Sequence, residues 1–97
     1  MKENKILTYI NFARKAGVVV YGIDNIKATK KDIFCVIIDS TAKENLLSSA
    51  KTYCKKHGLE LITLNCKLDD ILKTNNCKIL GICNQDLANQ ILINNKE

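Results

Sequence analysis

The chain has 97 residues, of which 46% are hydrophobic and 26% charged, and its formal net charge is +5. This composition favours one globular domain over 1–97 and excludes a disordered chain. No apolar run approaches the ~20 residues that span a bilayer, and the start is not that of a signal peptide, so we expect a cytoplasmic protein. The basic excess favours a polyanionic partner such as nucleic acid.

The first predicted helix carries Ile6, Ile10 and Ala13 on one face. It should end at Gly17, a position that suits a left-handed C-terminal cap. The β-branched and aromatic run 18–21 follows directly and predicts a short buried strand.

The next two elements are a brief helix and a strand. Gly22 closes the first strand, and a helix is expected from about Ile23 to Lys30. The continuous apolar run from Ile33 to Ile38 predicts an interior strand that is covered on both faces.

A capping-box pattern predicts the clearest helix of the chain. Thr41 is followed by Glu44 in a T-x-x-E arrangement, in which the threonine is the N-cap. Apolar residues keep helical spacing from there to Gly58, which should end the helix.

The remaining elements continue the alternation of strands and helices. Strands are expected over 59–64 and 78–83, a short helix is marked by Leu68, Ile71 and Leu72, and a closing helix by Leu87 and Ile91. Such alternation with short loops predicts a central sheet between two helical layers, which is a three-layer α/β/α sandwich.

The cysteines do not suggest a disulfide framework or a metal site. Their number is odd and no C-x-x-C pair occurs among them: Cys35, Cys54, Cys66, Cys77 and Cys83. Cys35 and Cys83 lie inside apolar strand-like runs, where a free thiol should behave as a small hydrophobe. Cys54 and His57 are spaced like metal ligands, but no second pair accompanies them. A histidine just before Gly58 also suits the end of a helix.

Motifs of catalysis are missing from the sequence. Asp39 follows an interior strand, with Ser40 and Thr41 beside it, but the capping box already uses Thr41. There is no glycine-rich phosphate loop, no nucleophile elbow and a single histidine. We therefore expect a protein that is not an enzyme and requires no cofactor.

Cations gather around the glycine turn that follows the first predicted strand. A helix that begins directly after Gly22 leaves backbone N–H groups unpaired, and Arg14, Lys15 and Lys27 are expected nearby. A phosphate backbone could dock there. The lysines of the helix before Gly58, namely Lys51, Lys55 and Lys56, fit a solvated face better than an RNA contact.

Four separated segments resemble a known family. They are FARKAGVVVYGID (12–24), STAKENL (40–46), YCKKHGLEL (53–61) and ILGICNQDLANQIL (79–92). In this order they are similar to the YlxQ-like bacterial branch of the ribosomal protein seven-Ae/thirty-e superfamily, over nearly the whole chain. The resemblance implies an α/β/α domain with a four-stranded mixed sheet that binds kink-turn RNA.

The family contacts RNA through a G-x-N-E-x-x-K pattern at the start of the second helix. Gly22 matches the glycine, while Asp24 stands at the asparagine, Asn25 at the glutamate and Ala28 at the lysine. A carboxylate at position 24 can only accept hydrogen bonds, whereas Asn25 both donates and accepts. Lys27 lies one residue early for the family lysine, which turns its side chain by about 100° around the helix.

A second family contact comes from the loop before the last strand. Here that loop runs over 73–78 and contains Asn75 and Asn76, with Lys78 at its end. Paired asparagines suit a turn, and their amides equally suit a nucleotide contact, so both interpretations stay open.

The sequence and the resemblance together predict a protein that binds structured RNA, namely a kink-turn or related non-canonical helix, in a ribosome- or translation-associated role. The residues expected to contact it are Arg14, Lys15, Gly22, Ile23, Asp24, Asn25, Lys27, Lys30, Lys31, Asn75, Asn76 and Lys78. The alternative is a protein-interaction module for ribosome-associated proteins or an RNA-processing assembly, which would present the glycine edge or the third helix. A steep salt dependence of binding distinguishes RNA from a protein partner.

Overall fold

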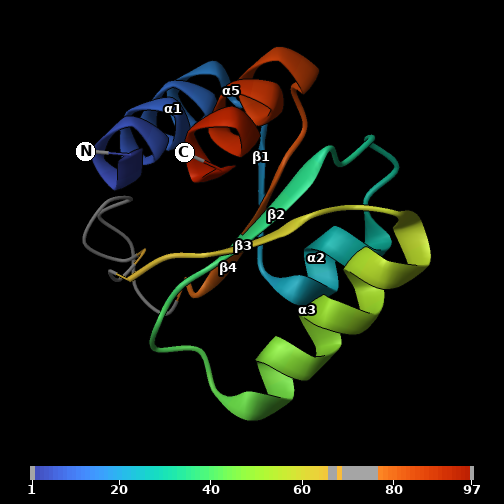
Figure 1. Cartoon of the computed structure of the whole chain (residues 1–97). Helices are drawn as coiled ribbons and strands as arrows, with labels where there is room; N and C mark the ends of the chain where they lie inside the picture. Colours follow the sequence, from blue (N-terminus) through green and yellow to red (C-terminus); the bar gives the residue numbers. More distant parts are fainter. Residues whose placement is uncertain (1, 66–67, 69–76, 97) are drawn as a thin grey trace.

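A computed structural model describes residues 2–65, 68 and 77–96. Its elements follow in the order α1 (Lys2–Ala16), β1 (Val19–Tyr21), α2 (Ile23–Ala28), β2 (Cys35–Ile38), α3 (Glu44–His57), β3 (Leu61–Thr63), β4 (Ile79–Ile82) and α5 (Gln85–Lys96). The predicted alternation of helices and strands is confirmed from α1 to β3 and from β4 to α5 (Figure 1).

The strands form one mixed sheet in the order β1-β4-β2-β3. β4 is antiparallel to both of its neighbours, and β2 and β3 are parallel. The register places Val20 and Val36 opposite Gly81, so the last strand of the chain lies between the first and the second.

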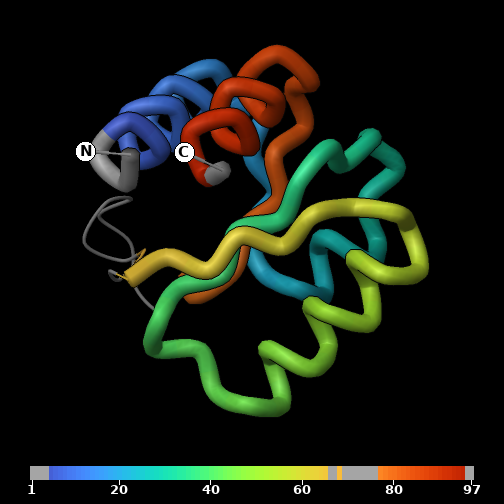
Figure 2. The backbone as a smooth tube through the Cα atoms, viewed as in Figure 1, coloured from blue at the N-terminus to red at the C-terminus, as the bar shows by residue number. Residues whose placement is uncertain are grey.

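Helices cover both faces of the sheet, which confirms the expected sandwich. α1 and α5, from opposite ends of the chain, lie side by side on one face, while α2 and α3 cover the other (Figures 1 and 2). Alternate residues of β2 enter the two cores: Cys35 and Ile37 face α1 and α5, and Val36 and Ile38 face α2 and α3. All four are fully buried, as predicted for an interior strand.

Two helix ends form where the glycines predict them. Gly17 has φ 72°, and the N–H of Val18 donates to the carbonyl of Ala13 at 3.0 Å. Gly58 has φ 66°, and the N–H of Leu59 donates to the carbonyl of Cys54 at 2.8 Å. Both bonds satisfy carbonyls that a helix end leaves without a partner.

The prediction of Thr41 as the N-cap of α3 is wrong. The cap position is held by Lys43, which makes no side-chain capping bond, and the helix begins at Glu44. Thr41 instead donates its N–H and its hydroxyl to Asp39 Oδ1, at 2.9 and 2.7 Å. The aspartate therefore competes successfully for the groups that a capping box would use.

The prediction of a buried first strand is also wrong. β1 lies at an edge of the sheet, its valines are half-buried, and Tyr21 is 39% exposed. The other strands are shorter than expected, and α2 stops at Ala28 because Thr29 is extended.

Leu68 is fully buried. Ile71 and Leu72, which marked the expected short helix with it, lie outside the described residues.

Candidate nucleic-acid interface

One end of the sheet brings together three segments that are distant in the sequence. β1 and β2 end there, and β4 begins between them. The N–H of Gly22 donates to the carbonyl of Ile79 at 3.0 Å, and the N–H of Asp39 donates to the carbonyl of Lys78 at 2.9 Å. The glycine turn and Lys78, both predicted to contact RNA, therefore lie at the same end.

The Gly22 turn, residues 22–25, presents backbone at an open surface. Gly22 has φ 87° and ψ 146°, a conformation that is essentially restricted to glycine. A Cβ added there would meet only the Asn25 Nδ2 atom, at 4.0 Å. Asp24 and Asn25 are exposed, while Ile23 packs against the core beneath α2 and α3. A ligand could thus approach the glycine backbone closely.

Asn25 also has a structural role in the turn. Its Nδ2 donates to the carbonyl of Tyr21 at 2.8 Å, which leaves Oδ1 as an acceptor toward solvent. Asp24 in the first turn of α2 brings a negative charge to the place where a phosphate would dock.

Lys78 is less free than the sequence suggests. It is half-buried, and its Nζ donates to Thr41 Oγ1 at 2.8 Å. Thr41 in turn donates to Asp39, whose Oδ2 accepts the N–H of Leu68 at 3.1 Å. Lys78 thus belongs to a polar cluster with Asp39 and Thr41 that fixes the loops at this end, and both Asp39 oxygens are engaged.

Arg14 and Lys15 lie on a different layer from α2. They lie in the last turn of α1, before β1 begins, whereas Gly22 follows the end of β1. The Nε and Nη2 atoms of Arg14 donate to Asn11 Oδ1, both at 3.3 Å. Burial raises the pKa of Tyr21, and the positive charge of Arg14 opposes that rise, so Arg14 acts electrostatically on the edge strand. Lys15 is exposed.

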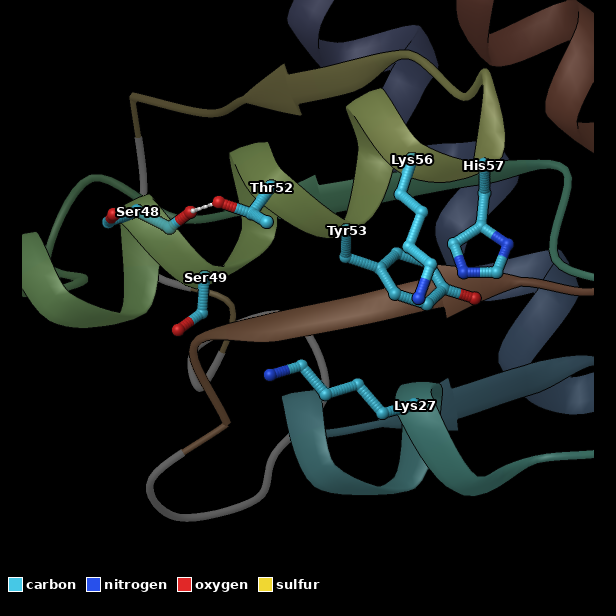
Figure 3. A pocket seen from close by; sticks show the side chains of 7 residues that line it. All are labelled: Lys27, Ser48, Ser49, Thr52, Tyr53, Lys56 and His57. Atoms are coloured by element: carbon cyan, nitrogen blue, oxygen red, sulfur yellow. Dashed lines mark hydrogen bonds between the residues drawn. The ribbon is translucent and has the colours of Figure 1, made fainter.

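The remaining predicted cations line a groove between α2 and α3. One hollow of about 490 Å³ has Lys27 on one side and α3 on the other, with Ser48, Ser49, Thr52, Tyr53, Lys56 and His57 (Figure 3). A second hollow of about 440 Å³ shares Lys27, Tyr53 and His57 with the first, and Lys30 and Lys31 line it. We call the two together the α2–α3 groove.

Sequence reasoning missed the α3 wall of this groove. The sequence signal for this wall is a spacing of four residues, which places side chains on one face of a helix. Ser48, Thr52 and Lys56 form one such row, and Tyr53 and His57 belong to the adjacent row. The Tyr53 and His57 rings lie 4.3 Å apart between centroids, tilted by 32°. Burial raises the pKa of Tyr53, so its phenol stays a neutral donor.

The predicted site is thus divided. Gly22, Ile23, Asp24, Asn25 and Lys78 share one end of the sheet, Lys27, Lys30 and Lys31 line the α2–α3 groove, and Arg14 and Lys15 belong to the opposite layer. Asn75 and Asn76 lie outside the described residues.

The structure also places the weaker candidates. Cys54 is buried in the core, whereas His57 on the same helix is exposed. Over 2–65, 68 and 77–96, no three His, Cys, Asp or Glu side chains are grouped to hold a metal ion. Within the same ranges, every helix is too short or too polar to cross a membrane.

Comparison with known proteins identifies a structural relative without assigned activity. No protein-family model matches the chain, and no curated protein matches it. A solved structure, described as a protein with unknown function from Bacillus halodurans C, superposes with a TM-score of 0.82 at 13% identity. The match covers 96% of this chain and 98% of that one. At this identity the likeness establishes the fold alone.

Proposed function

We propose that the protein is a non-catalytic RNA-binding protein that seats structured RNA on the Gly22 turn. The observation that carries the proposal is the open Gly22 backbone, with its positive φ, between an edge strand and a short helix. A glycine there removes the Cβ that would keep a ligand away from the backbone. Asn25 Oδ1 then offers an acceptor to base edges.

The fold supports the same function. The α/β/α sandwich with its mixed sheet is the fold that the resemblance to the ribosomal protein seven-Ae/thirty-e superfamily implies. In the YlxQ-like branch of that family, the role would be cytoplasmic and ribosome- or translation-associated. The engagement of both Asp39 oxygens by Thr41 and Leu68 favours a structural role for the carboxylate that would otherwise be the candidate catalyst.

Asp24→Asn tests the mode of binding, because it places the family residue at the start of α2. The amide can donate to a base edge and does not repel phosphates, so affinity for a kink-turn hairpin should rise by about tenfold. Electrophoretic shifts with the hairpin and a straight duplex, each at two salt concentrations, measure this gain. The duplex should gain much less than the hairpin.

Asp86→Asn is the matched control, since Asp86 is also exposed in a first helical turn but belongs to α5 on the other layer. It makes the same change in net charge away from the turn and should leave kink-turn affinity within about twofold. Equal gains for both variants, or no binding of either RNA by the parent protein, would contradict the proposal.

A protein-interaction module is the second candidate, and one observation favours it. Phe12 and Ile93 are 53% and 54% exposed and line a hollow between α1 and α5. Exposed apolar side chains in a shared hollow suit a protein contact. Binding at this surface would depend weakly on salt, whereas each phosphate neutralised on a duplex adds about 0.9 to the log–log slope.

A further inference from the structure

The α2–α3 groove combines three kinds of chemistry that meet nowhere on the Gly22 turn. The described residues that line it include one carboxylate, that of Asp32, and four lysines: Lys27, Lys30, Lys31 and Lys56. All four lysines are exposed. The groove is therefore positively charged along its length, from the middle of α3 to the loop after α2.

The α3 wall adds an aromatic surface and hydroxyl groups. Tyr53 and His57 are stacked along the helix, and Figure 3 shows both rings directed toward the hollow that Lys27 borders from α2. Tyr53 is half-buried against the core, which holds the pair in place, while His57 is exposed. Ser49 lies one turn before Tyr53 on the same wall and can donate to an anion.

We propose that the α2–α3 groove binds a single-stranded segment of RNA, with phosphates at Lys27 and Lys56 and a base stacked on the Tyr53–His57 pair. The proposal rests on the proposed function and adds a second contact surface to it. A basic groove with aromatic side chains is the arrangement by which proteins hold unpaired nucleotides. α2 links the two surfaces, since it begins at the Gly22 turn and Lys27 lies in its last turn.

RNA fits these features better than an acidic protein segment. Carboxylates would satisfy the lysines but would make no use of a stacked aromatic pair, whereas every base has a π-face that can extend it. The volume of the first hollow, about 490 Å³, is also in the range of sites that accept a small-molecule-sized group.

The charge contribution is tested with the double variant Lys27→Gln/Lys56→Gln. The probe is a labelled oligouridine of about 12 nucleotides, which covers one such groove. Loss of two phosphate contacts should lower the log–log salt slope by about 1.4 and weaken binding roughly 25-fold at 0.1 M salt.

The matched control is Lys51→Gln/Lys55→Gln, which removes two exposed lysines of the same α3 helix that do not line the groove. It should change oligouridine binding much less than the groove variant. Equal losses for the two pairs would overturn the proposal, because binding would then follow net charge alone.

The stacking contribution is tested with His57→Ala, whose exposed position should leave folding intact. Affinity for oligouridine should fall about tenfold, while affinity for an abasic oligonucleotide of the same length should not change. Equal losses on both probes would overturn the stacking assignment. Polyglutamate that binds as tightly as RNA, and is released by the Lys27→Gln/Lys56→Gln variant, would assign the groove to an acidic protein instead.

The two proposals fail in distinguishable ways. If the kink-turn hairpin binds, but oligouridine does not, the Gly22 turn keeps its function and the groove proposal is wrong. If neither RNA binds, both are wrong.

Discussion

Gly22 is the residue at which conformation and proposed function are most closely connected. Its φ of 87° was not evident from the sequence, but the glycine between a strand and a helix pattern indicated a turn that other residues avoid. The identity of the residues after it was equally visible. The sequence did not show that these residues divide between an open turn and a groove, because that division depends on where α3 packs beside α2.

We expect Gly22→Ala to affect both stability and RNA binding. The alanine must adopt a backbone conformation that disfavours a Cβ, which should lower the free energy of unfolding by about 1–3 kcal/mol. It also occupies the surface that RNA would approach, so kink-turn affinity should fall in fully folded protein. Urea unfolding and shift assays at low temperature measure the two effects separately.

Gly58→Ala provides the comparison, since Gly58 also has a positive φ, 66°, and a Cβ there would meet nothing within 4 Å. It should lose about 1–2 kcal/mol of stability and keep its affinity for RNA. If both variants lost affinity equally, Gly22 would have a structural role only.

At the scale of elements, the sequence predicted the existence of strands and helices better than their limits. β2 was recognised because all its residues are apolar, and the structure buries both of its faces. The T-x-x-E pattern misplaced the start of α3 because Asp39, two residues before Thr41, binds the N–H and hydroxyl of the threonine first. β1 has the composition of an interior strand, but strand order depends on long-range pairing that composition does not encode.

The uncapped start of α3 leads to a prediction about that helix. Lys43→Ser would place a side-chain oxygen at the cap position, where Lys43 makes no capping bond, and should raise the free energy of unfolding by about 1 kcal/mol. Denaturant unfolding measures the change. The same substitution within the helix, Lys51→Ser, should lower stability by a few tenths of a kcal/mol. An unchanged unfolding midpoint for Lys43→Ser would contradict this prediction, because it would show that the serine makes no stabilising capping bond.

At the scale of the whole molecule, the two layers differ in surface chemistry. α2 and α3 present lysines and an aromatic pair, whereas the α1–α5 layer exposes Phe12 and Ile93. The net charge of +5 favours a polyanionic partner, but it does not indicate where such a partner would bind. That position depends on the packing of helices that are separated in the sequence, which a helical pattern within one segment does not specify.

The buried thiols predict how stability depends on pH. Burial, with smaller contributions from Cys54 and Glu60, raises the pKa of Cys35 from 9.0 to about 12. The folded protein therefore keeps a proton that the unfolded chain releases above pH 9. The associated stability is complete below pH 9 and falls as pH rises toward 12, by at most about 1.4 kcal/mol per pH unit for this group.

Denaturant unfolding between pH 8 and 11 measures this dependence. Cys35→Ala should lower stability at pH 8 through lost packing, but the fall in stability above pH 9 should be shallower than in the parent protein. The same slope in both proteins would mean that Cys35 does not contribute. Tyr21, Tyr53, Cys54 and Cys83, whose pKa values burial also raises, should account for the slope that remains.

The position of β4 has a consequence for synthesis on the ribosome. Residues 79–82 occupy the middle of the sheet, and β1 pairs with this strand. Because translation proceeds from the N-terminus, β1 cannot form its hydrogen bonds to β4 until residues 79–82 have been synthesised, about 60 residues after β1. Nascent chains that stall before residue 79 should therefore lack a complete sheet. Protection from protease should appear in a single step after β4 has been made.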